Sequence, residues 1–267
     1  MKLSENRLAV AAPFIPILYL LIAIAPPPLF FLLVAAAILR AQFEFYKLYY
    51  REEKTSPAVY FGLTCGCLIL CLFYLHAPPI FFGASAFFVL MAILIFNLFL
   101  FREIRLTLLD SSVLYMGIFY LVGFLGHLIL IRQRPGGVPF IFFLLFVVWG
   151  NDAGAYYVGR SIGGKKLYPA ISPGKTVSGS IGGFVIGGIA GALCKIVFHL
   201  PFSWLEVIAL SQTLVAVGQL GDLVESMFKR SAGVKDSGGL IPAHGGLFDK
   251  LDGVAFAAPL LYYYIML

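Results

Sequence analysis

Residues 80–101 read IFFGASAFFVLMAILIFNLFLF, which is a run of 22 residues without a charged side chain. A transmembrane helix needs about 20 consecutive apolar residues, so this run is long enough to cross a bilayer. It is continuous rather than alternating, which excludes the pattern of a transmembrane β-barrel strand. Over the whole chain, 61% of residues are hydrophobic and 12% are charged, far from the composition of a soluble domain. The sequence therefore predicts an all-α polytopic membrane protein.

Similar apolar runs recur along the chain and predict about nine transmembrane helices. Prolines at 26–28 and 78–79 divide two overlong stretches into helical hairpins, because consecutive prolines do not continue a helix. The second span holds Arg40 and Glu44, whose charges must snorkel or face other helices. The predicted spans lie near residues 8–25, 28–46, 57–75, 80–101, 111–131, 138–158, 176–194, 203–221 and 253–267.

Lysine and arginine fall almost entirely on one side of these nine predicted helices. Sixteen of the nineteen lie on the side of the N-terminus, whereas Arg132, Arg134 and Lys195 lie opposite. Cytoplasmic loops carry the excess of Lys and Arg, so we predict a cytoplasmic N-terminus and an external C-terminus. The net charge of +6 suits anionic lipid headgroups or nucleotides, and no nucleic-acid partner is expected.

Almost all polar loop chemistry follows residue 150. We therefore predict an N-terminal transmembrane scaffold of about five helices over residues 1–135. Residues 136–267 are predicted to form a C-terminal catalytic transmembrane region of about four helices, with cytoplasmic loops at 159–175 and 222–252. Three polar clusters in this region fall at the predicted cytoplasmic ends of helices.

The first cluster is Asn151-Asp152, which places a carboxylate in the last third of the sixth predicted span. An unpaired charge at that depth costs roughly 2.5 to 3.5 kcal/mol, so a cation, an arginine or a metal is expected beside Asp152. A buried hydrogen bond between helices is the structural alternative. Asp152 is therefore a candidate site residue.

The second cluster, residues 172–176, reads SPGKT and has features of a phosphate-binding loop. Backbone N–H groups at a helix start, together with Lys175, can bind phosphate oxygens. It is not a Walker A motif, because position 169 is Pro where that motif requires Gly. A turn that carries a positive-inside lysine is the alternative. The glycines that follow are predicted to serve helix packing, at positions 179, 183, 187 and 191.

The third cluster, residues 221–253, carries five carboxylates and four Lys or Arg between two apolar spans. Two pairs of carboxylates are spaced by three residues, so the members of each pair share one helix face. The loop between them returns the chain to the same membrane surface, where the pairs can meet. The pairs are Asp222 with Glu225 and Asp249 with Asp252.

The chemistry of this third cluster favours a magnesium site. Oxygen ligands with a single His and no Cys suggest Mg²⁺ rather than zinc. Carboxylates that hold a metal beside cations are typical of phosphoryl or nucleotidyl transfer. The alternative is an interfacial loop whose acids and bases pair with each other and with lipid.

Residues 226–252 read SMFKRSAGVKDSGGLIPAHGGLFDKLD and resemble the signature of the phosphatidate cytidylyltransferases, also called CDP-diacylglycerol synthases. DAGAY at 152–156 and SPGKT at 172–176 resemble upstream elements of that family in the expected order. The resemblance covers about residues 150–253. Lys250 is a departure, because the family pattern has Arg there and bidentate phosphate geometry is lost.

The resemblance implies a nucleotidyltransferase of phospholipid biosynthesis that converts CTP and phosphatidic acid to CDP-diacylglycerol and pyrophosphate with Mg²⁺. A lipid phosphate oxygen would attack the α-phosphorus of CTP. It also implies a homodimer. We expect an integral protein of a bacterial inner (plasma) membrane whose active site faces the cytoplasm and takes its lipid substrate from the bilayer.

The site residues that follow from these patterns fall into three groups. The expected catalytic residues are Asp222, Asp249, Lys229, Arg230, His244 and Asp152. The expected ligands of Mg²⁺, with room for a second cation, are Asp222, Asp249, Asp252 and Glu225. The expected substrate-binding residues are Ser172, Lys175, Thr176, Lys235, Asp236, Gly245, Gly246 and Lys250.

Two other functions fit parts of the pattern. A CTP-dependent lipid kinase of the polyprenol type would use similar nucleotide-binding residues but release CDP instead of pyrophosphate. An ion-coupled transporter would explain intramembrane Asp152 and Asp222, but the polar clusters all face one side and no internal repeat is visible. A CDP-alcohol phosphotransferase is disfavoured, because its dense run of four aspartates is absent.

Overall fold

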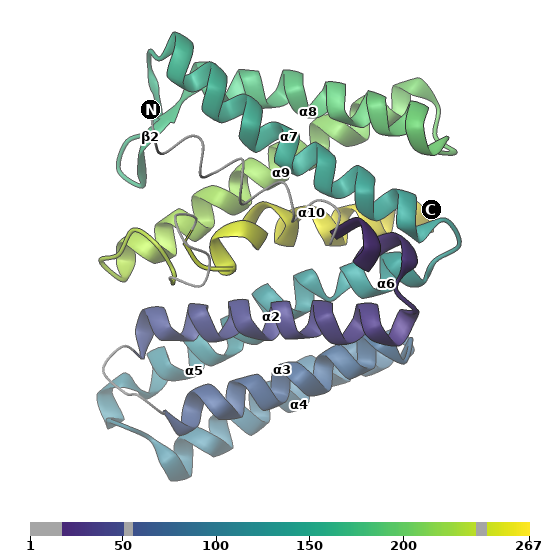
Figure 1. Cartoon of the computed structure of the whole chain (residues 1–267). Coiled ribbons are helices and arrows are strands. Elements are labelled where there is room, and N and C mark those ends of the chain that lie inside the picture. Colours follow the sequence, from purple (N-terminus) through teal and green to yellow (C-terminus); the bar gives the residue numbers. More distant parts are fainter. Residues whose placement is uncertain (1–17, 51–55, 239–244) are drawn as a thin grey trace.

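The computed structural model describes residues 18–50, 56–238 and 245–267, and these residues are mainly helical (Figure 1). Two short π-helical segments and one 3-10 turn are labelled η. In chain order the elements are η1 (Leu20–Ile24), α2 (Pro27–Tyr49), α3 (Pro57–Tyr74), α4 (Pro79–Leu100), η2 (Ile104–Leu106), α5 (Thr107–Met116), η3 (Gly117–Gly123), α6 (His127–Gln133), α7 (Gly137–Ile162), β1 (Lys166–Tyr168), β2 (Ser172–Thr176), α8 (Val177–Phe198), α9 (Trp204–Ser231) and α10 (Phe248–Met266).

Seven helical segments in the described residues are long and apolar enough to cross a membrane. They are α2, α3, α4, the segment Ile104–Gln133, α7, α8 and α9. The predicted class of an all-α polytopic membrane protein is therefore confirmed. The count of nine stays a prediction: the span near 8–25 lies mostly outside the described residues, and α10 carries charged residues in its first turn.

Prolines begin three of the N-terminal helices, as the predicted hairpin breaks require. Pro27, Pro57 and Pro79 lie in the first turns of α2, α3 and α4. A helix start has no intrahelical acceptor for its first N–H groups, so a residue without an N–H loses nothing there. The predicted breaks at 26–28 and 78–79 are confirmed.

Polar side chains of α2 join the N-terminal helices. Gln42 Nε2 donates to the Gly62 carbonyl of α3 and to Tyr46 Oη, both at 3.0 Å. Tyr46 Oη in turn donates to the Leu114 carbonyl of α5 at 3.0 Å. Buried polar groups must find partners, and the bonds to the Gly62 and Leu114 carbonyls fix α2 against α3 and α5.

The glycine face of α8 packs as predicted. Gly183, Gly187 and Gly191 are buried in α8 between α7 and α9. A Cβ at Gly187 would lie 2.5 Å from Val215 Cγ2 of α9 and 3.2 Å from the Val147 carbonyl oxygen of α7. Small residues let membrane helices approach closely, so this face brings three helices of the C-terminal half together.

Two predicted loops differ from the structure. The first is the loop expected at 159–175. An antiparallel β-hairpin forms there from residues 166–168 and 172–176, and it is the one sheet among the described residues. The loop expected at 222–252 begins later, because α9 continues to Ser231. Polar residues at helical spacing support this extension: Glu225 and Lys229 pair at 2.7 Å four residues apart.

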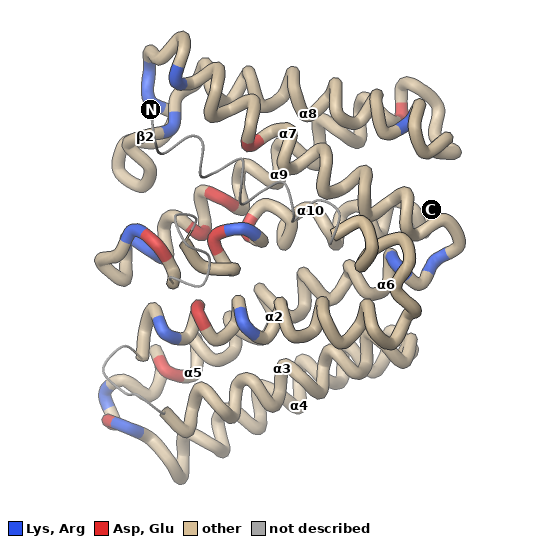
Figure 2. The backbone as a smooth tube through the Cα atoms, viewed as in Figure 1, with Lys and Arg blue, Asp and Glu red and all other residues tan. Residues whose placement is uncertain are grey.

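Charges gather at the end of the molecule that holds the hairpin (Figure 2). The C-terminus lies at the opposite end, where few basic residues are found (Figures 1 and 2). The predicted division between 1–135 and 136–267 falls in the turn between α6 and α7. It stays a prediction, since α10 also contacts α2 and α6.

Replacing Gly187 with Leu should destabilise the protein by about 1 to 3 kcal/mol, because the added side chain collides with α7 and α9. The matched control is Gly83→Leu on α4, where nothing lies within 4 Å of an added Cβ. Thermal unfolding in detergent measures both. Equal melting temperatures of the two variants would contradict the packing role of the glycine face.

Candidate functional site

The helices α9 and α10 cross at glycines near the charged end of the molecule. A Cβ at Gly221 would lie 2.6 Å from the Asp252 carbonyl oxygen, and one at Gly218 would lie 3.8 Å from the Gly253 carbonyl oxygen. At Gly221 only a residue without a side chain allows this approach of the two backbones, whereas a Cβ at Gly218 would make an ordinary contact. The crossing brings the carboxylates of the two helices to one place.

Three carboxylates meet there. Asp222 and Glu225 of α9 and Asp252 of α10 each offer one oxygen, and these atoms all lie within 4.8 Å of one another. Glu225 is 1% exposed, and its Oε1 has no hydrogen-bond partner among the described residues. We call Asp222, Glu225 and Asp252 the carboxylate triad. Such a group suits a hard cation with oxygen ligands.

Lys229 links the triad to the next carboxylate. Its Nζ lies 2.7 Å from Glu225 Oε2 and 2.8 Å from Asp249 Oδ1. The Lys229 side chain is 12% exposed. A buried cation between two buried acids offsets the cost of removing each charge from water, so Lys229 stabilises the acidic end of both helices.

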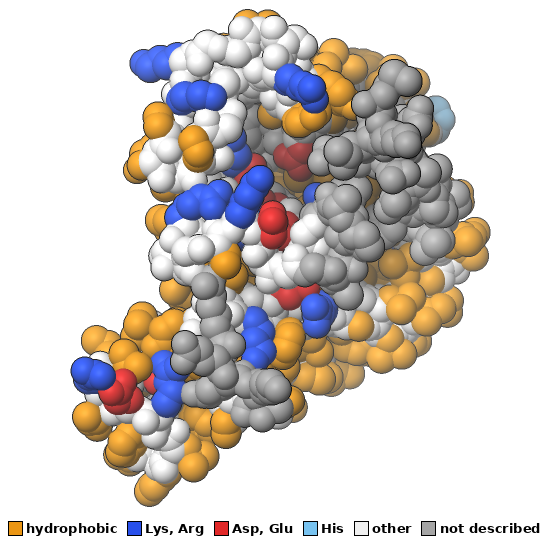
Figure 3. Space-filling model, turned by 60° about the vertical axis from the view of Figure 1, so that its left-hand side comes forward, with side chains coloured by type: hydrophobic (Ala, Val, Ile, Leu, Met, Phe, Trp, Pro, Cys, Tyr) orange, Lys and Arg blue, Asp and Glu red, His pale blue; other side chains and the backbone are white. Residues whose placement is uncertain are grey.

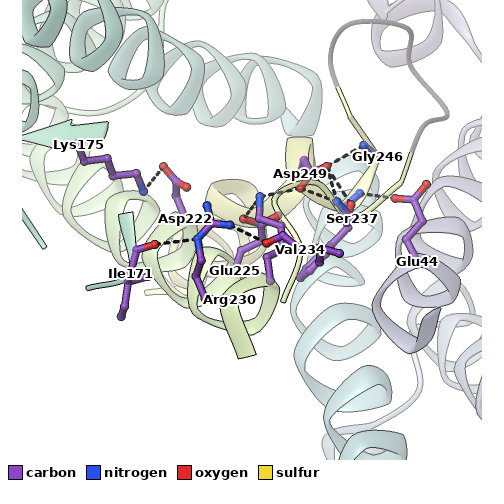
Figure 4. Close-up of polar contacts among 12 residues, drawn as sticks. Glu44, Ile171, Lys175, Asp222, Glu225, Arg230, Val234, Ser237, Gly246 and Asp249 are labelled. Atoms are coloured by element: carbon purple, nitrogen blue, oxygen red, sulfur yellow. Dashed lines mark hydrogen bonds and ion pairs between the residues drawn. The ribbon is translucent and has the colours of Figure 1, made fainter. Parts of the chain in front are cut away.

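Asp249, predicted as a metal ligand, lies outside the triad and is bound by the loop before α10 (Figure 4). Its Oδ2 accepts from the Gly246 N–H at 2.7 Å, from the Ser237 N–H at 3.1 Å and from Ser237 Oγ at 3.0 Å. Burial acts to raise the pKa of Asp249, but the Lys229 ammonium group and the Gly246 N–H hold this pKa below its usual range. Asp249 is therefore anionic at neutral pH.

The β-hairpin delivers a cation to the triad. Lys175 of β2 places its Nζ 2.5 Å from Asp222 Oδ2 (Figure 4). Arg230 of α9 donates to the Ile171 carbonyl at 3.2 Å and to the Val234 carbonyl at 2.6 Å. Arg230 thus ties the hairpin turn to the end of α9 and directs its guanidinium at backbone oxygens.

A cavity of about 560 Å³ opens beside Asp222 and is lined by α7, β2, α8 and α9. Asp152, Arg160 and Lys175 line it together with Asp222. Its volume lies in the range of small-molecule sites, about 300 to 1,000 Å³. Figure 3 shows acidic side chains in a hollow on this side of the molecule, with basic side chains around it.

A network of side-chain amides holds Asp152 in the cavity wall. Gln219 Nε2 donates to Asn151 Oδ1 at 2.8 Å, and Asn151 Nδ2 donates to Asp152 Oδ1 at 3.0 Å. Ser180 Oγ donates to Gln219 Oε1 at 2.5 Å. The alternative of a hydrogen bond between helices applies to Asn151, which binds Gln219 of α9, whereas Asp152 is bound by its neighbour Asn151 and lines the cavity.

The remaining predicted residues are dispersed. Thr176 lines the cavity, but its Oγ1 accepts the Gly179 N–H at 3.0 Å and so caps α8. Ser172 pairs with Tyr168 in the hairpin and does not line the cavity. Gly246 is buried, and Gly245 has a left-handed φ of 84°. The side chains of Lys235, Asp236 and Lys250 are exposed. His244 lies outside the described residues.

Three residues at the site were not predicted from the sequence. Gln219 precedes Asp222 by one helical turn in an apolar span, so its spacing from Asp222 could have indicated that it lies at the site. Glu44 accepts the Phe248 N–H at 2.9 Å, and its charge inside an apolar span was the sign that it faces other helices. Ser237 binds Asp249 from a loop without regular spacing, where the sequence carried no signal.

Comparison with known proteins gives a consistent result. A model of the cytidylyltransferase family matches residues 5–267. A protein of Bacillus subtilis called phosphatidate cytidylyltransferase is 37% identical over 215 residues, 76% of this chain and 77% of its own length. A protein of the same name from Brucella suis is 46% identical over 148 residues, which are 55% of this chain and 54% of that protein.

Replacing Lys229 with Gln should destabilise the protein by about 3 to 5 kcal/mol, because Glu225 and Asp249 lose their shared buried cation. The matched control is Arg105→Gln, which breaks the exposed pair with Glu103 and should change little. Chemical denaturation in detergent compares the two variants. A Lys229→Gln protein as stable as the control would show that the buried pairs contribute no net stability.

Proposed function

Because this chain belongs to the cytidylyltransferase family, we propose that it transfers the cytidylyl group of CTP to phosphatidic acid and releases pyrophosphate. The product is CDP-diacylglycerol. The observation that carries this proposal is that Asp222, a member of the carboxylate triad, lines a cavity together with the cationic side chains of Lys175 and Arg160. Nucleotidyl transfer needs both features, since a triphosphate brings several negative charges to one place.

The triad fits Mg²⁺. Its donors are carboxylate oxygens from two helices, and the buried Glu225 Oε1 has no competing hydrogen-bond donor among the described residues. Asp222, Glu225 and Asp252 would hold the ion, which when bound would neutralise phosphate oxygens and polarise the α-phosphorus. Asp249 is held instead by Lys229 and the loop before α10. A second cation is part of the proposal, with Asp152 facing the same cavity.

The chain's own cations serve the phosphates. Lys175 and Arg160 line the cavity and would neutralise the triphosphate. Lys175 pairs with Asp222 at 2.5 Å, so the phosphate would compete with this carboxylate for the ammonium group. An anionic oxygen of the lipid phosphate attacks the α-phosphorus, and the bond from that phosphorus to the oxygen of pyrophosphate breaks. No general base is required, because a phosphate monoester carries about −1.5 to −2 charges at pH 7.

Substrate contacts by the dispersed residues belong to this proposal as well. Thr176 lines the cavity, whereas Ser172 and Gly245 are supported by their place in the sequence motifs. The sequence motifs are also the support for His244, Gly246, Lys235, Asp236 and Lys250. Arg230 would act by holding the hairpin that carries Lys175.

The proposed reaction takes place at the cytoplasmic surface of a bacterial inner membrane. CTP is soluble, whereas phosphatidic acid keeps its tails in the bilayer, so a cavity at the ends of membrane helices serves both. The gathering of charges at the hairpin end supports a cytoplasmic position of that end (Figure 2). The proposal includes nine helices, a cytoplasmic N-terminus, an external C-terminus and a homodimer.

The two other functions make different demands. A polyprenol-type kinase would transfer the γ-phosphoryl group and leave CDP. A transporter needs access from both sides, but the cavity lies at the hairpin end, where β2 and the last turns of α7 line it. The cytidylyl transfer is therefore the function that the geometry supports best.

Purified protein in detergent with phosphatidic acid, Mg²⁺ and CTP labelled at the α-phosphorus should move the label into lipid. Asp222→Asn should lower this activity by more than roughly 100-fold, because a ligand of the triad is lost. The matched control is Asp110→Asn, which removes a carboxylate paired with Arg102 at 3.3 Å in the N-terminal half. It should keep its activity per folded molecule.

Two results of this assay would contradict the proposal. Label that remains in soluble CDP would identify a kinase, and no turnover would favour a transporter. Full activity of Asp222→Asn would remove the metal role from the triad.

The proposed orientation predicts which loops are reached from outside the cell. With the four native cysteines changed to Ala, single cysteines are placed at Arg134, after α6, and at Lys166 in β1, both exposed. A membrane-impermeant maleimide added to intact cells should label Arg134→Cys and not Lys166→Cys. The reverse pattern would show that the protein has the opposite orientation. Labelling of both variants would show that the hairpin can be reached from outside the cell.

A further inference from the structure

We propose that Glu44, in the N-terminal half, is a positioning residue for the catalytic end of α10. The inference rests on the proposed function and extends it to a residue far from the sequence motifs. Glu44 lies on α2, 204 residues before the backbone amide that it binds. It is 2% exposed, although it carries a charge within a candidate membrane span.

Glu44 caps α10 from another helix. Its Oε2 accepts the N–H of Phe248, the first residue of α10, at 2.9 Å. The N-cap residue Leu247 makes no side-chain cap hydrogen bond. The first N–H groups of a helix have no partner within the helix, and a negative charge is favoured there. A carboxylate from α2 therefore accepts a backbone N–H at the start of α10, which is the usual role of a Ser or Asp at the N-cap.

The same carboxylate also contacts the backbone that precedes α10. A Cβ at Gly246 would collide with Glu44 Oε2, and one at Gly238 would lie 3.2 Å from Glu44 Oε1. Glycine at both positions is what lets Glu44 lie against this backbone. Arg40 offsets the buried charge, with its Nε 3.0 Å from Glu44 Oε1.

The position of Glu44 bears directly on Asp249. The Gly246 N–H donates to Asp249 and the Phe248 N–H donates to Glu44, so neighbouring amides of one turn bind the two carboxylates (Figure 4). Asp249 binds Lys229, and Lys229 binds Glu225 of the triad. Loss of the cap would release the turn that orients Asp249 and, through Lys229, disturb the triad.

A purely structural role makes a different prediction from a positioning role. If Glu44 only stabilises the fold, its loss lowers stability but leaves the turnover of each folded molecule unchanged. If Glu44 positions the turn, its loss lowers kcat in the folded molecule and loosens the amides around Asp249. Gln42 supplies the matched control: it is fully buried on α2, binds Tyr46 and Gly62, and points to a different helix face.

The experiment compares Glu44→Ala, Glu44→Gln and Gln42→Ala in the full chain, with two readouts for each. Cytidylyl transfer per folded molecule should fall roughly 10- to 100-fold in kcat for Glu44→Ala, since small displacements of a site cost that much. Glu44→Gln should retain more activity, because its amide oxygen can still accept the Phe248 N–H. Hydrogen exchange over residues 245–250 should accelerate in Glu44→Ala and not in Gln42→Ala.

Unchanged kcat and unchanged exchange in Glu44→Ala would overturn the inference, as would the same loss of kcat in Gln42→Ala. If the wild type shows no cytidylyl transfer, the proposed function fails. Hydrogen exchange then decides the position of the turn without reference to activity.

Discussion

The structure depends on one constraint: acidic side chains at the ends of membrane helices must meet compensating charge. Asp222, Glu225 and Asp252 lie together because α9 and α10 cross at glycines, and repulsion among three carboxylates opposes that arrangement. Lys175 from the hairpin and Lys229 from α9 supply part of the compensation. The rest is what the bound cation of the proposed reaction would provide. The clustering of three acids, which repulsion opposes, is thus the feature that the proposed chemistry uses.

The site draws on both halves of the chain. The glycine face of α8 joins α7 and α9, and these helices with β2 form the cavity wall. The N-terminal half contributes through α2, which contacts α10. Gln42 and Tyr46 bind α3 and α5 from the other face of α2. A region with few sequence motifs therefore supports the position of the motif-rich region.

Much of this fold could be predicted from the sequence because membrane spans follow from apolar length, and helix breaks follow from proline. The packing role of the α8 glycines follows from helical spacing, and the meeting of Asp222 with Asp252 follows from the loop that returns the chain to the same end of the helices. The hairpin at 166–176 could not be predicted, because its strands of three and five residues have no clear alternation. The partners of Asp249 and the cap from Glu44 depend on contacts distant in sequence, about which spacing within one helix carries no information.

The central claim is that the carboxylate triad holds a divalent cation. Binding of Mn²⁺, as a spectroscopic substitute for Mg²⁺, can be followed by electron paramagnetic resonance in detergent without nucleotide. The account predicts a bound ion in the wild type and an affinity at least about tenfold weaker in Asp252→Asn, with Asp110→Asn unchanged. Equal binding by the wild type and Asp252→Asn would contradict it.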